Sequence, residues 1–190
     1  MFGDLFNQVE LSFIFISAVL FLGGIYLAPS AVDRDIRFLL AYPRWMARLM
    51  ERYFKTRWGF LIIFFLIFTL NNISLFTGFI SGYFIIFPAL FAFFTGFHVA
   101  VIGYDMMGWK GIWHMLVNPV AWLEFPAAWI STSLGFRLAL TVLTEHSYSA
   151  ATQTFRELFP LYQKYVMTLL FLAALLEAAL IRFADSMQNK

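Results

Sequence analysis

From Trp58 to Tyr104 the chain runs for 47 residues without an Asp, Glu, Lys or Arg side chain. As a single helix, rising about 1.5 Å per residue, this stretch would be roughly 70 Å long, about twice the hydrocarbon thickness of a bilayer. It must therefore fold back on itself inside a membrane. The composition agrees, because 62% of the residues are hydrophobic and 13% are charged, about half the charged fraction of a typical soluble domain. The sequence predicts an all-α, polytopic transmembrane bundle.

Hydropathy predicts five membrane crossings within a single domain that covers residues 1–190. The expected spans are residues 11–28, 59–82, 84–104, 120–143 and 165–184. Pro29 is expected to end the first span, and residues 144–164 are expected to form a polar outer loop. The fold is therefore expected to be a compact bundle without a separate catalytic module.

Two segments leave alternatives open. Asn71 and Asn72 fall in the middle of the second span, where their amides either bond to another helix or mark a break that adds a sixth short piece. The Trp-rich segment 108–119 is expected to form a re-entrant or interfacial hairpin, with Trp109 and Trp113 at the headgroup level.

Residues 31–57 form a basic amphipathic segment between the first two spans. Seven of the 13 basic residues lie there: Arg34, Arg37, Arg44, Arg48, Arg52, Lys55 and Arg57. Because cytoplasmic loops collect Lys and Arg, this segment is expected in the cytoplasm, with the N-terminus outside and the C-terminus cytoplasmic. We expect two helical pieces hinged at Pro43, lying along the membrane surface. They serve either as a topology determinant or in recognition of anionic lipid or a partner, and nucleic-acid binding is not expected.

A cluster of polar residues is predicted inside the bundle. Charges at membrane depth are costly and usually face a partner or a cavity. Glu124, Glu177 and His98 all fall in the cytoplasmic half of their spans, with Asn71 and Asn72 nearer the midplane. One hypothesis is a proton or cation site in this cluster. The alternative is a hydrogen-bond network that holds the helices together.

Two further charges and several small residues have expected places. Arg137 is expected to snorkel toward the outer face or to meet another chain, and Arg182 is placed to neutralise Glu177. Small residues that let helices approach closely lie on the fourth and second spans: Ala127, Ser131, Gly135 and Ala139, and Gly78 and Gly82. They are expected to pack helices within one chain or to form a homodimer.

The sequence carries no recognisable enzymatic motif. The three His residues are dispersed and there is no Cys, so no metal site, thiolate or cofactor is expected. The chain is therefore expected not to be an enzyme.

One set of motifs resembles a known family. After Asn71-Asn72 come an apolar span with Gly78 and Gly82, a Thr95-Gly96 pair, and the segment Asn118-Pro119-Val120-Ala121-Trp122-Leu123-Glu124-Phe125-Pro126-Ala127, followed by Gly135 and Arg137. This order resembles the integral-membrane family of stage II sporulation protein M. Its signature has His-Gly where this chain has Val120-Ala121, and it tends to have Asn where this chain has Thr95.

The resemblance implies a function as well as a fold. In spore-forming bacteria the family member resembles a membrane scaffold that works with peptidoglycan-remodelling partners. We therefore expect a scaffold in the lipid bilayer that recruits protein partners, including a second copy of itself as one possibility. The alternative is a small transporter or channel with a cation or proton site around Glu124, because discontinuous helices are typical of transporter sites.

Overall fold

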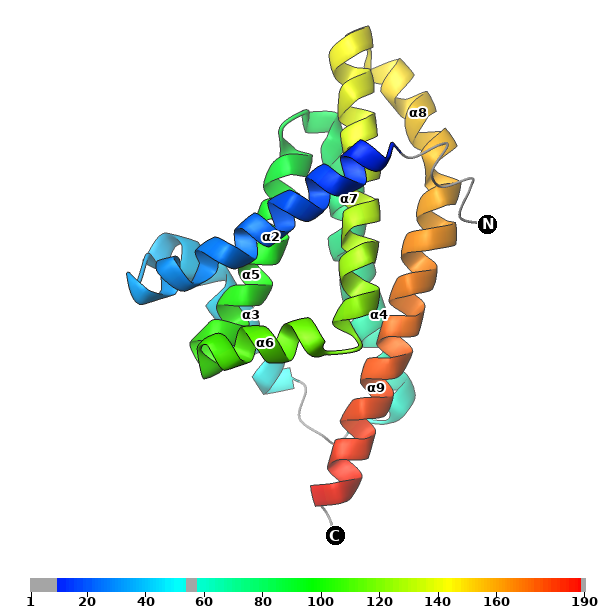
Figure 1. Ribbon diagram of the computed structural model, residues 1–190. Helices are drawn as coiled ribbons and strands as arrows, with labels where there is room; N and C mark the ends of the chain where they lie inside the picture. The colour runs from blue at the N-terminus through cyan, green and yellow to red at the C-terminus, as the bar shows by residue number, and fades with distance from the viewer. Residues whose placement is uncertain (1–9, 54–57, 189–190) are drawn as a thin grey trace.

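The structure, a computed structural model, describes residues 10–53 and 58–188 (Figure 1). Every regular element in these residues is helical. The elements are α2 (Leu11–Asp33), α3 (Arg37–Tyr53), α4 (Phe60–Ile80), the 3-10 turn η1 (Ser81–Phe84), α5 (Phe87–Met107), α6 (Trp109–Val117), α7 (Ala121–Glu145), α8 (Tyr148–Leu161), the π-helical turn η2 (Tyr162–Met167) and α9 (Thr168–Gln188).

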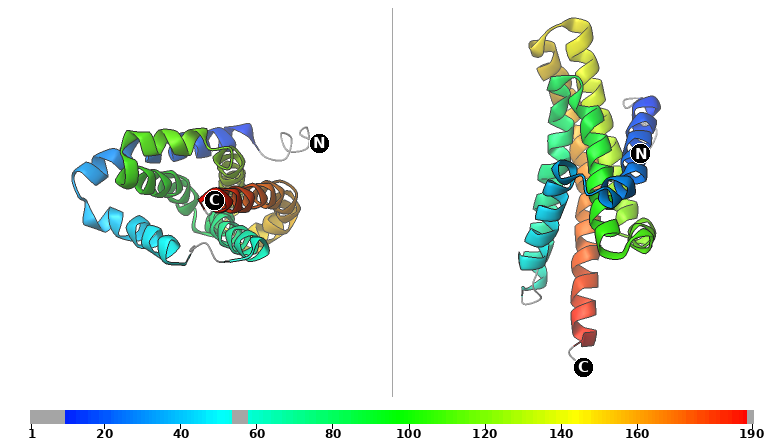
Figure 2. Two further views of the ribbon diagram at one scale, coloured as in Figure 1. Left: turned by 90° about the horizontal axis from the view of Figure 1, so that it is seen from below. Right: turned by 90° about the vertical axis from the view of Figure 1, so that its left-hand side faces the viewer.

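Five helices in the described residues are long and apolar enough to cross a membrane, which confirms the predicted all-α membrane bundle. They are Leu11–Asp33, Phe60–Phe84, Phe87–Met107, Ala121–Glu145 and Tyr148–Ala184. Their outer surfaces carry large apolar side chains; Phe15 and Ile86, for example, are 70% and 68% exposed. Such a surface suits lipid and not water. The fourth helix, α7, is the most buried of the five and runs through the middle of the molecule (Figures 1 and 2).

The segment expected as a polar outer loop is mostly helical, and that expectation is wrong. The Ser147 hydroxyl accepts a hydrogen bond from the amide of Ala150 and so caps the start of α8. From there the chain continues through α8, η2 and α9 as one long helical stretch. The turn before it is short because His146 ends α7 in the left-handed conformation.

Three expected breaks do not occur. Pro29 lies inside α2 and Pro43 lies inside α3, so neither ends or divides its helix. A proline inside a helix removes one backbone hydrogen bond, yet both helices continue past these positions. The helix α4 also runs unbroken through Asn71 and Asn72, so there is no sixth piece.

The Trp-rich segment 108–119 contains one helix, α6, and not a hairpin. Gly108, with φ of 59°, reverses the chain between α5 and α6. Close contact of Gly103 with Gly111 then holds α6 against the end of α5. Figure 2 shows α2 and α6 on one side of the bundle and α3 with α4 on the other.

The crossing of α2 over α5 depends on two glycines. A methyl group on Gly24 would overlap the carbonyl oxygen of Phe93, and one on Gly96 would overlap the carbonyl oxygen of Phe21. The two backbones are therefore in direct contact. This is how small residues allow close helix packing in a membrane.

The predicted small-residue ridge on α7 is used within the chain. Ala127, Ser131, Gly135 and Ala139 are all buried. The Ser131 hydroxyl donates a 2.5 Å hydrogen bond to the carbonyl of Leu75 on α4. Gly135 also contacts the backbone of Gly78 and of Gly82. The ridge is thus covered by α4 and η1, so a homodimer would need another surface.

Candidate functional site

A tight elbow between α6 and α7 positions the first turn of α7. The side-chain oxygen of Asn118 accepts a hydrogen bond of 3.0 Å from the amide of Val120. The indole of Trp122 donates one of 2.9 Å to the carbonyl of Leu116. These bonds fix where α7 begins, and they leave Glu124 in its first turn, where the helix dipole favours a negative charge.

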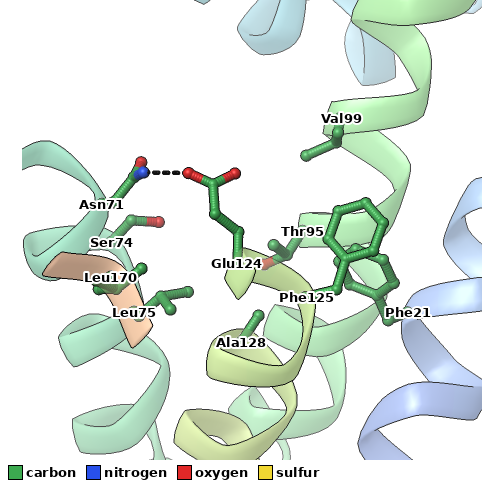
Figure 3. A pocket seen from close by; sticks show the side chains of 10 residues that line it. All are labelled: Phe21, Asn71, Ser74, Leu75, Thr95, Val99, Glu124, Phe125, Ala128 and Leu170. Atoms are coloured by element: carbon green, nitrogen blue, oxygen red, sulfur yellow. Dashed lines mark hydrogen bonds between the residues drawn. The ribbon is translucent and has the colours of Figure 1, made fainter. Parts of the chain in front are cut away.

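The Glu124 carboxylate reaches into a cavity of about 140 Å³ between the helices. Residues from α2, α4, α5, α7 and α9 line this cavity: Phe21, Asn71, Ser74, Leu75, Thr95, Val99, Glu124, Phe125, Ala128 and Leu170. The amide nitrogen of Asn71 donates a hydrogen bond of 2.5 Å to Oε1 of Glu124 (Figure 3). We call this space the Glu124 cavity. Several water molecules would fit in it.

Glu177 lies on α9, close enough for its charge to repel that of Glu124. No basic side chain compensates the two acids: among the described residues, no ion pair involves Glu124 or Glu177. The expected neutralisation of Glu177 by Arg182 is therefore not found.

Asn72 makes a different contact from its neighbour. Its side-chain oxygen accepts a hydrogen bond of 2.6 Å from the hydroxyl of Tyr162, which also reaches the Asn72 carbonyl at 3.1 Å. Tyr162 is the first residue of the π-helical turn η2 and is almost fully buried. Asn72 therefore joins α4 to η2, while Asn71 joins α4 to α7.

His98 lies outside the Glu124 cavity, in contrast to the predicted cluster. Its ring packs against Tyr42 of α3, with ring centres 4.9 Å apart, and against Phe94 at 5.6 Å. It lines a second cavity, of about 390 Å³, between α3, α4 and α5. Ser74, Thr95 and Val99 line both cavities, so the two are neighbours.

Arg137 meets an acid of the same chain. Its guanidinium forms an ion pair of 2.7 Å with Glu10, just before α2 begins. The charge of Arg137 is thus balanced within the chain, without the contact to another chain that was one of the two expectations. The pair ties the start of α2 to the second half of α7.

A second ion cluster was not predicted. The Arg44 guanidinium contacts Asp105 at 2.6 Å and Asp35 at 2.7 Å, and so connects α3 to the end of α5 and to the turn after α2. Hydrogen bonding from Arg44 lowers the pKa of Asp35 below its ordinary value, and these bonds raise the pKa of Arg44. The sequence showed a run of basic residues but not which acids face it.

Tyr162 was also missed, because it lies within residues 144–164, which were expected to form a polar outer loop outside the bundle. In the part of the chain that the structure describes, no three His, Asp or Glu side chains form a group that could hold a metal ion.

The comparison with protein families decides the identity of this fold. The family model described as stage II sporulation protein M matches residues 11–180. The chain belongs to the stage II sporulation protein M family. The match runs from the start of α2 to within α9, so it covers the first four spanning helices in full and the fifth up to residue 180. In this family member the segment from Asn118 to Ala127 forms the α6–α7 elbow and carries Glu124 into the cavity.

No curated protein and no solved structure matches the chain. The family and the five apolar helices make it a membrane-embedded protein.

Proposed function

We propose that this chain is a non-enzymatic membrane scaffold that recruits or organises partner proteins, as the family resemblance suggests. The proposed orientation has the N-terminus outside and the C-terminus in the cytoplasm. Under this proposal the chain supplies a rigid frame in the bilayer, and its partners supply the chemistry. In relatives that take part in sporulation, the corresponding role would be envelope remodelling.

The observation that carries the proposal is that polar groups inside the bundle form hydrogen bonds between helices. Three hydrogen bonds connect α4 to other helices. Asn71 of α4 donates to Glu124 of α7, and α4 accepts from Ser131 of α7 and from Tyr162 of η2. Each joins one helix to another. Groups engaged in this way brace the fold, which favours a frame over a path lined with free polar side chains.

The size of the Glu124 cavity also supports this proposal. At about 140 Å³ it is smaller than the 300–1,000 Å³ that typical small-molecule sites occupy. A substrate of ordinary size would need more room than the Glu124 cavity alone offers.

A second candidate function rests on one specific observation. The Glu124 carboxylate is hydrogen-bonded to an amide, repelled by Glu177 and unpaired with any cation among the described side chains. A carboxylate in such a setting favours binding of a proton or a small cation. The alternative function is therefore a small transporter or channel that uses Glu124.

Cysteine labelling separates the two functions, because the chain has no natural Cys. Ser74→Cys places a thiol where the two cavities meet. A scaffold predicts no reaction with a polar thiol reagent in sealed vesicles, and a transporter predicts rapid reaction. The exposed His146→Cys serves as the reactive control, and the fully buried Ser17→Cys serves as the unreactive one.

Purification and reconstitution complete the test. The scaffold proposal predicts a partner that co-purifies in stoichiometric amount in mild detergent. It also predicts no proton or cation flux in liposomes that contain the chain alone. Flux that is lost in Glu124→Gln would overturn the scaffold in favour of the transporter.

A further inference from the structure

Two adjoining cavities lie between α3 and α5. The larger is the cavity of about 390 Å³ beside His98, with Tyr42 and Met46 of α3 on one wall and Phe91 of α5 on the other. The smaller, of about 170 Å³, has Arg48 of α3 on its wall. Pro43 and Ile102 line both cavities, which therefore meet where α3 packs on α5. We call the pair the α3–α5 furrow.

The furrow changes in character along α5. Its apolar end begins near Phe91, and its polar end lies at Asp105, close to the end of the helix. Fourteen residues separate these two positions, about 21 Å of helix. The furrow therefore has an apolar part within the span and a charged part at its edge, which is the layout of an amphiphilic ligand.

Arg48 gives the polar end its unbalanced charge. Arg44, one turn earlier on α3, is occupied by Asp35 and Asp105. Arg48 is exposed, and in the described part of the chain it has no ion-pair partner. A guanidinium of this kind suits a phosphate, which it can contact through two parallel hydrogen bonds. The basic helix around it would also attract anionic lipid.

The apolar end suits a hydrocarbon chain better than water. Most of the residues around the larger cavity are aromatic or aliphatic, and apolar cavities stay dry. Residues of α3 form one wall of this cavity, and α3 runs along the edge of the molecule (Figure 2, left), where lipid surrounds the spanning helices. An acyl chain can therefore enter it from the bilayer.

We propose that the α3–α5 furrow binds one anionic phospholipid, with an acyl chain in the larger cavity and the phosphate on Arg48. A zwitterionic lipid carries a second, positive charge that this site does not balance. The site therefore prefers a lipid with net negative charge. The proposal does not depend on the scaffold role.

Native mass spectrometry of the purified, delipidated protein tests the proposal. The protein is mixed in detergent with equal amounts of phosphatidylglycerol and phosphatidylcholine that have the same acyl chains. We expect one phosphatidylglycerol to be retained in preference. Arg48→Gln should weaken that retention about tenfold, as loss of a charged hydrogen bond does.

The matched control is Arg37→Gln, which removes the same charge from the same helix. Arg37 is 91% exposed and lines neither cavity, so its substitution should leave retention unchanged. Equal loss in both variants would show bulk attraction of charge and overturn the site. Glycerol phosphate, which has no acyl chain, should not compete; full competition by it would overturn the lipid in favour of a free phosphate.

A measurement on the unmodified protein covers the case in which Arg48→Gln does not fold. Phosphatidylglycerol should raise the Tm of the wild-type chain more than phosphatidylcholine does, because a ligand that binds only the folded state stabilises it. Equal shifts with the two lipids would overturn the proposal.

Discussion

Asn71 on α4 donates a hydrogen bond of 2.5 Å to Glu124 on α7, inside a cavity that five helices line. The bond joins the middle of one spanning helix to the first turn of another. It gives a half-buried acid its polar partner and gives the amide a strong acceptor. The stability of the bundle should therefore depend on whether the side chain that replaces Glu124 can still accept this hydrogen bond.

Glu124→Gln should change the stability little, whereas Glu124→Leu should lower it. The glutamine carbonyl can still accept from Asn71, but leucine leaves the amide without a partner. Interhelical hydrogen bonds in membranes contribute about 0.5–2 kcal/mol, so a loss of this size is expected for the leucine variant. Thermal unfolding in detergent, followed by tryptophan fluorescence, measures it. A leucine variant as stable as the wild type would show that the bond does not brace α4 and α7.

Gly24→Ala should destabilise the fold strongly, and Gly23→Ala should not. A methyl group on Gly24 would collide with the backbone carbonyl of Phe93, whereas one on Gly23 meets no atom within 4 Å. Overpacking costs about 1–3 kcal/mol, and backbone cannot move aside as a side chain can. The Tm values of the two variants measure the difference. Equal values would contradict the close crossing of α2 and α5.

The ion cluster at Arg44 should make stability depend on pH. Arg44 holds the pKa of Asp35 below its ordinary value. A carboxyl with a lowered folded pKa contributes stability above its unfolded pKa, and this contribution is lost as the pH falls through the folded pKa. Asp35→Asn should therefore be less stable than the wild type at neutral pH. The difference should shrink as the pH falls below about 4.

Asparagine is the suitable replacement because position 35 has a φ of 44°, which Asn tolerates. Denaturation in detergent at several pH values gives the comparison. High salt at neutral pH should also reduce the difference, since the cluster is exposed. A difference that stays constant with pH and salt would show that the effect of the variant is not electrostatic.

Tags on the two ends of the chain should lie on opposite sides of a sealed vesicle. An odd number of crossings requires this, and under the proposed orientation, with the basic segment 31–57 in the cytoplasm, the C-terminal tag should be cytoplasmic. Protease treatment of right-side-out and inverted vesicles, with detection of each tag, measures the arrangement. Two tags cleaved from the same side would contradict five crossings.

Much of the fold could be predicted from the sequence because the membrane restricts it. Long charge-free stretches have to be helices in lipid, and all five appear where hydropathy placed them, apart from the extension of the last by α8. This extension could not be seen because Thr152, Gln153, Arg156 and Glu157 resemble a polar loop. Once Ser147 caps the chain, the same residues form a helix with one apolar face.

The candidate site was harder to predict because helix contacts decide it. The position of a residue along a span predicts its depth in the membrane, but not which neighbouring helix its side chain faces. Glu124 and Asn71 face each other, whereas His98, at similar depth, faces α3. The helix α4 is not broken at Asn72, where the side-chain oxygen accepts a hydrogen bond from the hydroxyl of Tyr162. The contact between Gly24 and α5 was missed although the sequence carries a signal for it. On α5 the small residues Ala92, Gly96 and Ala100 repeat every four positions, and on α2 Gly24 and Ala28 have the same spacing.

The stretch from Tyr148 to Ala184 has 37 residues and measures about 55 Å, while the hydrocarbon layer is only about 30 Å thick. The part of the helix that exceeds this thickness has to lie outside the hydrocarbon layer. Because α8 is the more polar end of this stretch, the tip between α7 and α8 should project into water. An antibody fragment or an epitope inserted at this tip would thus offer a handle on the protein in intact cells without disturbing the packed interior.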